Sequence, residues 1–142
     1  MTLFVDTSAL LAFLDADQPR HADAVDAWRR ALHDRDTLVT SNYVLVETYA
    51  LVQRRLGLEA LRDLANDFLP LMEPLWVDEA LHAAATAALF TAGHRKLSLV
   101  DCTSFEIMRR HGITAALSLD ADYAQQGFRL LPPAAASASR RP

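Results

Sequence analysis

The chain has 142 residues, 51% of them hydrophobic and 23% charged, which is typical of one soluble globular domain. A single cysteine, Cys102, excludes an internal disulfide, and without a leader-like or membrane-spanning apolar segment we expect a cytoplasmic protein with no membrane partner. The net charge of −4 disfavours a nucleic-acid partner, unless carboxylates gather in one site where a metal ion neutralises them.

Apolar runs and amphipathic segments alternate along the chain. They predict strands at 3–5, 37–41, 73–78, 114–120 and 127–131, and helices at 7–17, 19–33, 41–57, 58–72, 78–94 and 97–112. Ser41 or Asn42 caps the third of these helices, Gly57 stops it, and the fourth ends at Pro70 or soon after.

Strands that alternate with helices favour an α/β fold with a largely parallel central sheet covered by helices on both faces. No internal repeat or linker divides the chain, so we expect one domain over residues 1–131. The segment 132–142, PPAAASASRRP, has no periodicity and is predicted to be a disordered tail.

Two aspartates directly follow predicted strands. Asp6 comes after the apolar run LFV, and Asp120 ends the segment TAALSLD. Sites in open parallel sheets form outside the carboxyl ends of the strands, so both acids are candidate site residues. Helix capping is the structural alternative, because an aspartate accepts hydrogen bonds from the free N–H groups of a following helix.

Glu47 is predicted to lie on a mostly apolar face of its helix. Its neighbours three and four residues away are Tyr43, Val44, Ala50 and Leu51. An ionised carboxylate in such surroundings is costly unless it is paired or binds a metal. Burial against an arginine and a place in a metal site both satisfy this condition, and Glu47 alone does not decide between them.

Asp101 has a clear explanation as a helix start, because Ser98 and Asp101 have the spacing of a variant capping box. Its helical neighbours Leu97, Ser98, Ser104 and Phe105 are small or apolar, which points the acid inward. Together with Asp6, Glu47 and Asp120, a capping explanation has to hold four separate times.

Other residues give weaker indications of a site. The five histidines lack zinc-site spacing, Cys102 is expected to fill the core, and the four glycines form no phosphate-binding loop. Trp28 and Trp76 are expected in the core or in a groove.

Four segments occur in the order seen in PIN-domain proteins: VDTSALLAF, SNYVLVETYAL, LSLVDCTSFEIMRRHGI and ALSLDADYAQQGFRLL. The chain resembles this family up to about Pro132, and within it most closely the ribonuclease toxins of VapBC toxin–antitoxin modules. The resemblance implies a PIN-like fold, a homodimer, and an antitoxin whose C-terminal segment packs along a groove and obstructs the active site. The apolar helices around Trp28, Tyr43 and Leu45 are candidate groove surface.

The resemblance also assigns site residues. The family's acidic cluster falls on Asp6, Glu47, Asp101 and Asp120, as catalytic and metal-binding residues, and Thr7 and Ser8 match the hydroxyl positions that support the metal site. The last motif, commonly Thr-x-Asp, is here Ser118-Leu119-Asp120 with Asp122 following. Asp122 is therefore a further candidate for metal or water binding, and the sequence does not rank it against Asp120.

Oxygen ligands of this kind favour Mg²⁺, with Mn²⁺ as a substitute. One or two such ions activate water for attack on a phosphodiester, so we expect a metal-dependent endoribonuclease with an RNA substrate and no protein nucleophile. The alternatives are a PIN-domain nuclease that is not a toxin, a receiver-like or metal-binding signalling domain, and a metal-free binding module.

Two further comparisons fit the residues less well. A haloacid-dehalogenase type of phosphoryl transfer needs a second aspartate where this chain has Ser8. A receiver-like domain needs an acidic pair after the first strand and a lysine after a late strand, whereas Lys96 precedes a predicted helix.

Overall fold

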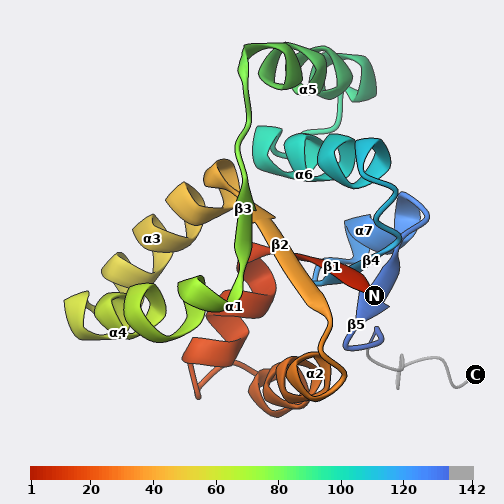
Figure 1. Ribbon diagram of the computed structural model, residues 1–142. Helices are drawn as coiled ribbons and strands as arrows, with labels where there is room; N and C mark the ends of the chain where they lie inside the picture. Colours follow the sequence, from red (N-terminus) through yellow and green to blue (C-terminus); the bar gives the residue numbers. More distant parts are fainter. Residues whose placement is uncertain (135–142) are drawn as a thin grey trace, which may run out of the picture.

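Figure 1 shows the computed structural model of the chain, which describes residues 1–134. The elements in chain order are β1 (Thr2–Val5), α1 (Thr7–Leu14), α2 (His21–His33), β2 (Thr37–Ser41), α3 (Asn42–Leu56), α4 (Leu58–Asp63), β3 (Glu73–Leu75), α5 (Glu79–Ala92), α6 (Leu99–Arg110), β4 (Ala115–Leu117), α7 (Ala121–Gln125) and β5 (Arg129–Leu131). A π-helical turn, Leu64–Phe68, and a 3₁₀ turn, Leu69–Leu71, connect α4 to β3.

The five strands form one sheet in the order β3-β2-β1-β4-β5, and every neighbouring pair is parallel. β1 lies in the centre, where Phe4 is opposite Val39 of β2 and Ala116 of β4. Because all strands run in the same direction, their carboxyl ends share one edge of the sheet. The predicted fold class is confirmed.

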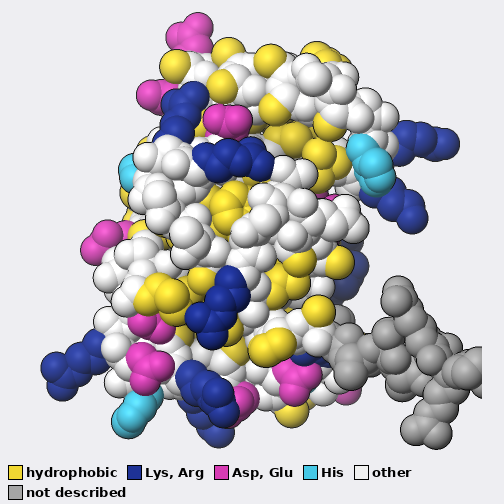
Figure 2. All heavy atoms as spheres, turned by 90° about the vertical axis from the view of Figure 1, so that its right-hand side faces the viewer, with side chains coloured by type: hydrophobic (Ala, Val, Ile, Leu, Met, Phe, Trp, Pro, Cys, Tyr) yellow, Lys and Arg dark blue, Asp and Glu magenta, His cyan; other side chains and the backbone are white. Residues whose placement is uncertain are grey.

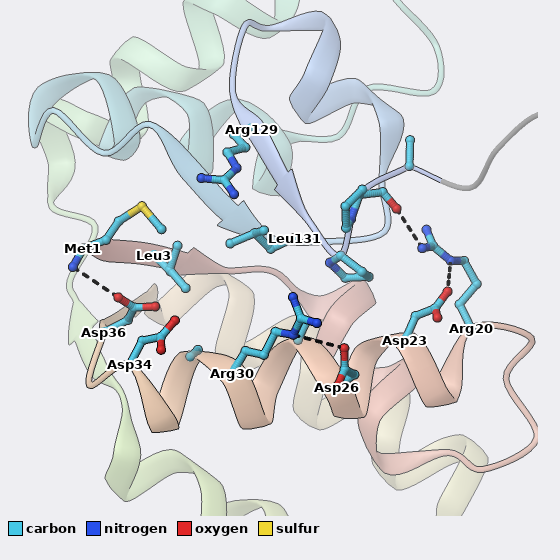
Figure 3. Close-up of a pocket in the computed structure, with 15 residues that line it drawn as sticks. Met1, Leu3, Arg20, Asp23, Asp26, Arg30, Asp34, Asp36, Arg129 and Leu131 are labelled. Atoms are coloured by element: carbon cyan, nitrogen blue, oxygen red, sulfur yellow. Dashed lines mark hydrogen bonds and ion pairs between the residues drawn. The ribbon is translucent and has the colours of Figure 1, made fainter.

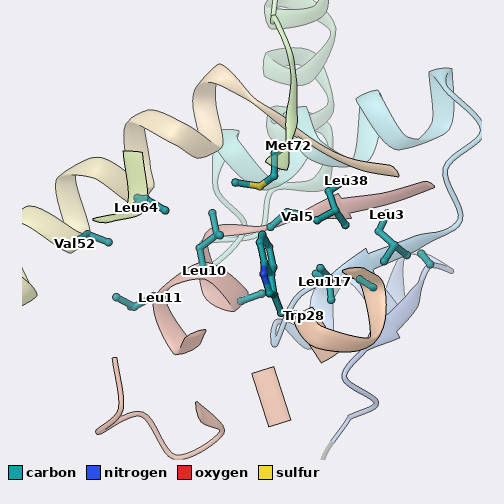
Figure 4. Close-up of a cluster of buried hydrophobic side chains, with 13 residues drawn as sticks. Leu3, Val5, Leu10, Leu11, Trp28, Leu38, Val52, Leu64, Met72 and Leu117 are labelled. Atoms are coloured by element: carbon teal, nitrogen blue, oxygen red, sulfur yellow. The ribbon is translucent and has the colours of Figure 1, made fainter. Parts of the chain in front are cut away.

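Alternate residues of β1 enter two hydrophobic clusters, one on each face of the sheet. Leu3 and Val5 pack with residues of α1, α2 and α3, in the cluster that Figure 4 shows. Phe4 packs with residues of α5, α6 and α7. Helices therefore cover both faces, as the sequence predicts, and the central strand is buried on both sides.

Several predicted elements differ from the structure in their bounds. The helix expected over 58–72 is α-helical only to Asp63 and continues as a π-helical and a 3₁₀ turn to Leu71; its predicted end, at Pro70 or soon after, is confirmed, because Pro70 has no N–H and its ring obstructs a continuing α-helix. The strand expected over 73–78 ends at Leu75. The sequence analysis missed α7, which is short and begins after Asp120.

The two tryptophans lie in different surroundings, and Trp28 corrects the prediction that it forms part of a groove surface. Trp28 is 5% exposed and packs in the core with Phe13 and Phe68, so it cannot offer groove surface to a partner. Trp76 is 73% exposed and does not belong to the core. Tyr43 and Leu45 are partly exposed and remain candidate groove residues.

The predicted tail, 132–142, lies outside the described residues from position 135 onward. Before that point the chain still contacts the domain: Pro132 is buried, and Arg20 Nη2 donates to the Pro133 carbonyl oxygen at 2.8 Å. Within residues 1–134, no helix is both long enough and apolar enough to cross a membrane.

Candidate active site

The acids predicted as site residues reach the carboxyl edge of the sheet from separate parts of the chain. Asp6 follows β1 and Asp120 follows β4, which are neighbouring strands. The Asp6 N–H donates to the carbonyl oxygen of Leu117, at the end of β4, at 3.0 Å. Asp101 lies in the first turn of α6, and Glu47 lies in α3. Four different elements therefore supply the predicted acids.

Asp101, Asp120 and Asp122 converge most closely. One carboxylate oxygen of each lies within 4.8 Å of the other two, and all three residues are half-buried. Asp6 and Glu47 lie outside this group of three, but Asp6 is near enough to raise the pKa of Glu47, Asp101 and Asp120 through its charge. The structure brings all five acids into one region, and it places both Asp120 and Asp122 in the tightest group.

Asp6 is held by hydrogen-bond donors. It is 4% exposed, and its Oδ2 accepts from the Ser8 N–H at 3.3 Å, the Ser8 hydroxyl at 2.7 Å and the Ser118 hydroxyl at 3.1 Å. Its Oδ1 accepts from the Tyr123 hydroxyl at 3.1 Å. Hydrogen bonds to a carboxylate are strong, so these contacts fix the orientation of Asp6. Oδ2 is fully occupied, whereas Oδ1 keeps one lone pair without a donor among the described residues.

The sequence analysis did not identify Tyr123. This residue of α7 is fully buried, and its ring packs edge-on against Phe105 with 4.9 Å between centroids. Burial, with the nearby Asp6 charge adding to it, raises the pKa of Tyr123 well above its usual value, so the phenol keeps its proton and donates to Asp6. The two residues are 117 positions apart, and no local pattern signals their contact.

The hydroxyl residues predicted to support the site make contacts with different elements. Ser8 and Ser118 link the ends of β1 and β4, with 3.2 Å between their hydroxyl oxygens. Ser118 Oγ also accepts from the Asp120 N–H at 3.0 Å, which ties Asp120 to the same network. Thr7 points to α3 instead, where its hydroxyl lies 3.0 Å from that of Thr48 and lowers the pKa of Glu47. Thr7 thus connects Glu47, and not the group of three aspartates, to the end of β1.

Burial and mutual repulsion make the site acids weaker acids. Burial is the largest cause in each case. Burial, together with the charges of Asp6 and Asp120, raises the pKa of Asp101 to about 6 against the opposing hydrogen bonds from Ser98. Burial also raises the pKa of Glu47 and Asp120. An ionised carboxylate is therefore unfavourable here without a cation.

No cationic side chain compensates these acids within residues 1–134. The ion pairs of the described chain involve other carboxylates: Asp23, Asp26, Asp36, Glu59 and Glu106. Burial against an arginine, the structural alternative for Glu47, thus finds no support.

Capping and site formation are combined in three of the acids. The side chains of Asp6 and Asp120 accept N–H bonds at the starts of α1 and α7, and Asp101 completes a capping box with Ser98. The capping explanation is correct for each of these residues, but it does not exclude a place in a metal site. Capping orients each carboxylate at a helix start, and the parallel sheet brings the helix starts together.

The donor set fits a hard divalent cation. It consists of carboxylate oxygens, with hydroxyl groups beside them, and Asp101, Asp120 and Asp122 are close enough to share one ion. Mg²⁺ and Mn²⁺ prefer such ligands, and a bound cation removes the repulsion that raises the pKa of these acids. Asp6 is close enough to this group to raise the pKa of Asp101 and Asp120, and Glu47 lies beside Asp6, so both could contribute to the same centre or to a second one.

Comparison with known proteins extends this description. The model of the PIN domain family matches residues 3–129. VapC20 of Mycobacterium tuberculosis, named as a 23S rRNA-specific endonuclease, is 35% identical over 127 residues, which cover 89% of this chain and 95% of VapC20.

Solved structures agree with the family match. The crystal structure of Mycobacterium tuberculosis VapC20, described as a Sarcin-Ricin loop cleaving toxin, superposes with a TM-score of 0.76 at 34% identity, over 89% of this chain and 95% of that one. The structure of VapBC2 from Rickettsia felis, bound to a DNA fragment from its promoter, has a TM-score of 0.68 at 12% identity and covers 92% and 97% of the two chains. At that identity the likeness concerns the fold alone.

Proposed function

Because this chain belongs to the PIN domain family and is a homologue of VapC-type ribonucleases, we propose that it is a metal-dependent endoribonuclease and the toxin of a toxin–antitoxin pair. One observation carries the proposal. Three carboxylates converge within 4.8 Å at the carboxyl edge of the sheet, and no cation compensates them in residues 1–134. A binding module would have no reason to concentrate repelling charge in this way.

We assign the metal centre to Asp6, Asp101, Asp120 and Asp122, with Mg²⁺ as the expected ion and Mn²⁺ as a substitute. When bound, such an ion lowers the pKa of a water molecule and stabilises charge on the leaving oxygen of a phosphodiester. Ser8, Ser118 and Tyr123 hold the Asp6 carboxylate in place for this task. Hydrogen-bonded partners of metal ligands commonly have this orienting role.

Glu47 has a separate role in the proposal. Burial raises its pKa, and it lies beside Asp6 without belonging to the group of three aspartates. A raised pKa makes a carboxylate a stronger base than an ordinary one. We therefore assign Glu47 to proton uptake from the attacking water, together with a supporting part in metal binding.

The expected substrate is structured RNA. VapC20 bears a name that specifies 23S rRNA and the sarcin–ricin loop, and its similarity extends over most of both chains. A ribosomal RNA hairpin is therefore the first substrate to test. Structural neighbours from FitAcB and VapBC2 support a cognate antitoxin, and we propose a homodimer and a cytoplasmic site of action on the family resemblance alone. The exposed side chains of Val46 and Tyr49, on α3 beside Leu45, add apolar surface for such partners.

Two alternatives receive less support. A receiver-like signalling domain needs a lysine after a late strand, but Lys96 lies in the turn between α5 and α6. A PIN nuclease that is not a toxin would have the same site, and only biological activity separates it from the proposal.

RNA cleavage tests the enzymatic part directly. The purified protein should cut a hairpin that carries the sarcin–ricin sequence in Mg²⁺ or Mn²⁺, and excess EDTA should stop the reaction. The Asp120→Asn variant, purified in parallel, controls for a contaminating nuclease. Cleavage that continues in EDTA, or that is equal in this variant, would refute the metal-dependent mechanism.

Expression in bacteria tests the toxin part. Production of the chain alone should arrest growth, and co-expression of the neighbouring small gene should relieve the arrest. An active nuclease that is harmless when expressed would keep the enzymatic proposal and remove the toxin role.

A further inference from the structure

We propose that a groove between the α5–α6 turn and α7 binds the nucleotide next to the scissile phosphate, and that Arg95 and Lys96 contact the phosphates of the same strand. This inference rests on the proposed endoribonuclease function and adds where the RNA strand lies. It assigns the groove to RNA and not to a small molecule or a protein partner.

The groove adjoins the acidic cluster. It has a volume of about 190 Å³ and is lined by Ala92, His94, Leu97, Asp122, Gln125 and Gln126. Asp122 also belongs to the group of three aspartates within 4.8 Å. One side chain thus borders both the groove and the proposed metal centre, so a strand whose phosphate lies at the acids has its next nucleotide at the groove.

A pair of cations beside the groove favours a polyanion at this position. The five acids at the carboxyl edge repel RNA phosphates, and the whole chain has a net charge of −4, so RNA needs cations nearby. Arg95 and Lys96 lie between the groove residues His94 and Leu97, they are exposed, and they form no ion pair within the described part of the chain.

Exposed cations are common in turns, and a solvated turn is the simplest explanation of Arg95 and Lys96. This explanation does not account for their position beside a groove that adjoins the site acids. Figure 2 shows basic side chains and a histidine together at one edge of the molecule, towards the end that α5 and α6 form in Figure 1.

The groove lining suits a base. Ala92 and Leu97 offer apolar contact, His94 offers an aromatic ring, and Gln125 offers an amide that can donate and accept. Proteins recognise unpaired RNA bases by this combination of stacking on a ring and hydrogen bonding to a base edge. Gln126 is already engaged, because its Oε1 accepts from Arg109, which leaves Gln125 as the free amide.

Salt dependence of RNA binding tests the phosphate contacts. A fluorescein-labelled hairpin with the sarcin–ricin sequence is titrated with protein in EDTA, so that no cleavage occurs, over a series of salt concentrations. The double variant Arg95→Gln/Lys96→Gln should reduce the slope of log K against log[salt] by about 1.5, since each lost phosphate contact is worth ~0.7 to 0.9. The matched control is Arg54→Gln/Arg55→Gln at the end of α3, which removes the same charge far from α7 and should leave the slope unchanged (Figure 1).

A neutral substitution tests the base contact. Gln125→Ala should weaken hairpin binding several-fold with the wild-type salt slope, because it removes a base contact and no charge. Mn²⁺ binding, measured by calorimetry, should be equal in all of these variants and the wild type. This readout separates the groove from the metal centre.

The outcomes distinguish the inference from the function on which it rests. Equal slopes for the two double variants, or unchanged affinity for Gln125→Ala, would overturn the groove assignment even if the wild type cuts RNA. A wild type that binds the hairpin with the predicted slopes, but fails to cut it in Mg²⁺, would overturn the nuclease and leave an RNA-binding groove.

Discussion

Aspartates gather along α2 and at the carboxyl edge of the sheet, and the two groups differ in what neutralises them. On and beside α2, Asp23 pairs with Arg20 at 3.0 Å, Asp26 with Arg30 at 3.4 Å, and Asp36 with the N-terminal ammonium group at 3.1 Å (Figure 3). At the carboxyl edge, the acids of the proposed site have hydroxyl and N–H donors but no cation among the described residues.

The larger of the two cavities lies against α2. It has a volume of about 530 Å³ and is lined by α2, β1, β5 and the residues after β5, against about 190 Å³ for the groove beside Asp122. Three of the four aspartates that line it form ion pairs, whereas none of the site acids does so within residues 1–134. Carboxylates without a cationic partner, more than cavity size, therefore distinguish the carboxyl edge.

The largest expected difference between the two regions concerns catalysis. Asp120→Asn should lower the rate of RNA cleavage more than ~100-fold, since even partners behind the metal ligands are worth 10–100-fold. Asp26→Asn, which removes an ion-paired aspartate of α2, should cleave at the wild-type rate. Both rates are measured on the same hairpin in Mg²⁺. Similar losses in the two variants would mean that the two regions do not differ in function.

Metal-dependent stability should separate the carboxyl edge from α2 next. At a Mg²⁺ concentration 100 times its Kd, the wild type should gain about 2.7 kcal/mol in free energy of unfolding, because the ion binds only the folded state. Asp26→Asn should gain the same amount, and Asp101→Asn should gain clearly less. Thermal melts with and without Mg²⁺ measure these gains. An equal gain in Asp101→Asn would place the bound ion elsewhere.

The hydroxyl donors of the carboxyl edge give the third prediction. Tyr123→Phe keeps the ring against Phe105 and removes one donor from the buried Asp6, so the metal-free protein should lose about 2 kcal/mol in free energy of unfolding. Tyr43→Phe is the matched control, because its hydroxyl contacts His82 near the surface and its loss should cost less than about 0.5 kcal/mol. Chemical denaturation measures both. Equal stabilities would show that Asp6 does not depend on the Tyr123 hydroxyl.

Most of the fold could be predicted from the sequence because local signals determine it. The buried run at 3–5, the Ser41 cap and the Gly57 stop each act over a few residues, and the alternation of strands with helices restricts the sheet to a parallel one. The change to a π-helical turn after Asp63 and the short α7 were harder to place, since irregular turns and short helices depend on tertiary packing.

The proximity of the predicted site acids follows from the sequence for a different reason. Parallel strands share a carboxyl edge, so acids that follow β1 and β4 must lie close together. The contact between Tyr123 and Asp6 could not be predicted, because it depends on how α7 packs under the edge. Capping and a place in the acidic group were treated as alternatives, but the structure combines them: Asp101 completes a capping box and still lies within 4.8 Å of Asp120 and Asp122.

This double role of Asp101 gives the smallest predicted effect and the most direct test of uncompensated charge. Its pKa is raised from 3.8 to about 6, so the folded protein binds this proton more tightly than the unfolded chain does. The ionised Asp101 therefore destabilises the folded protein, fully above pH ~6 and less as the pH falls towards 4. From about pH 7.5 to pH 5, the metal-free wild type should gain about 1 kcal/mol in free energy of unfolding relative to Asp101→Asn, after allowance for solvent screening. Asn can still accept the Ser98 N–H, so the variant keeps the cap and loses only the titrating charge. Urea unfolding of both proteins in EDTA measures the difference, and parallel pH profiles would mean that the charge of Asp101 is already compensated.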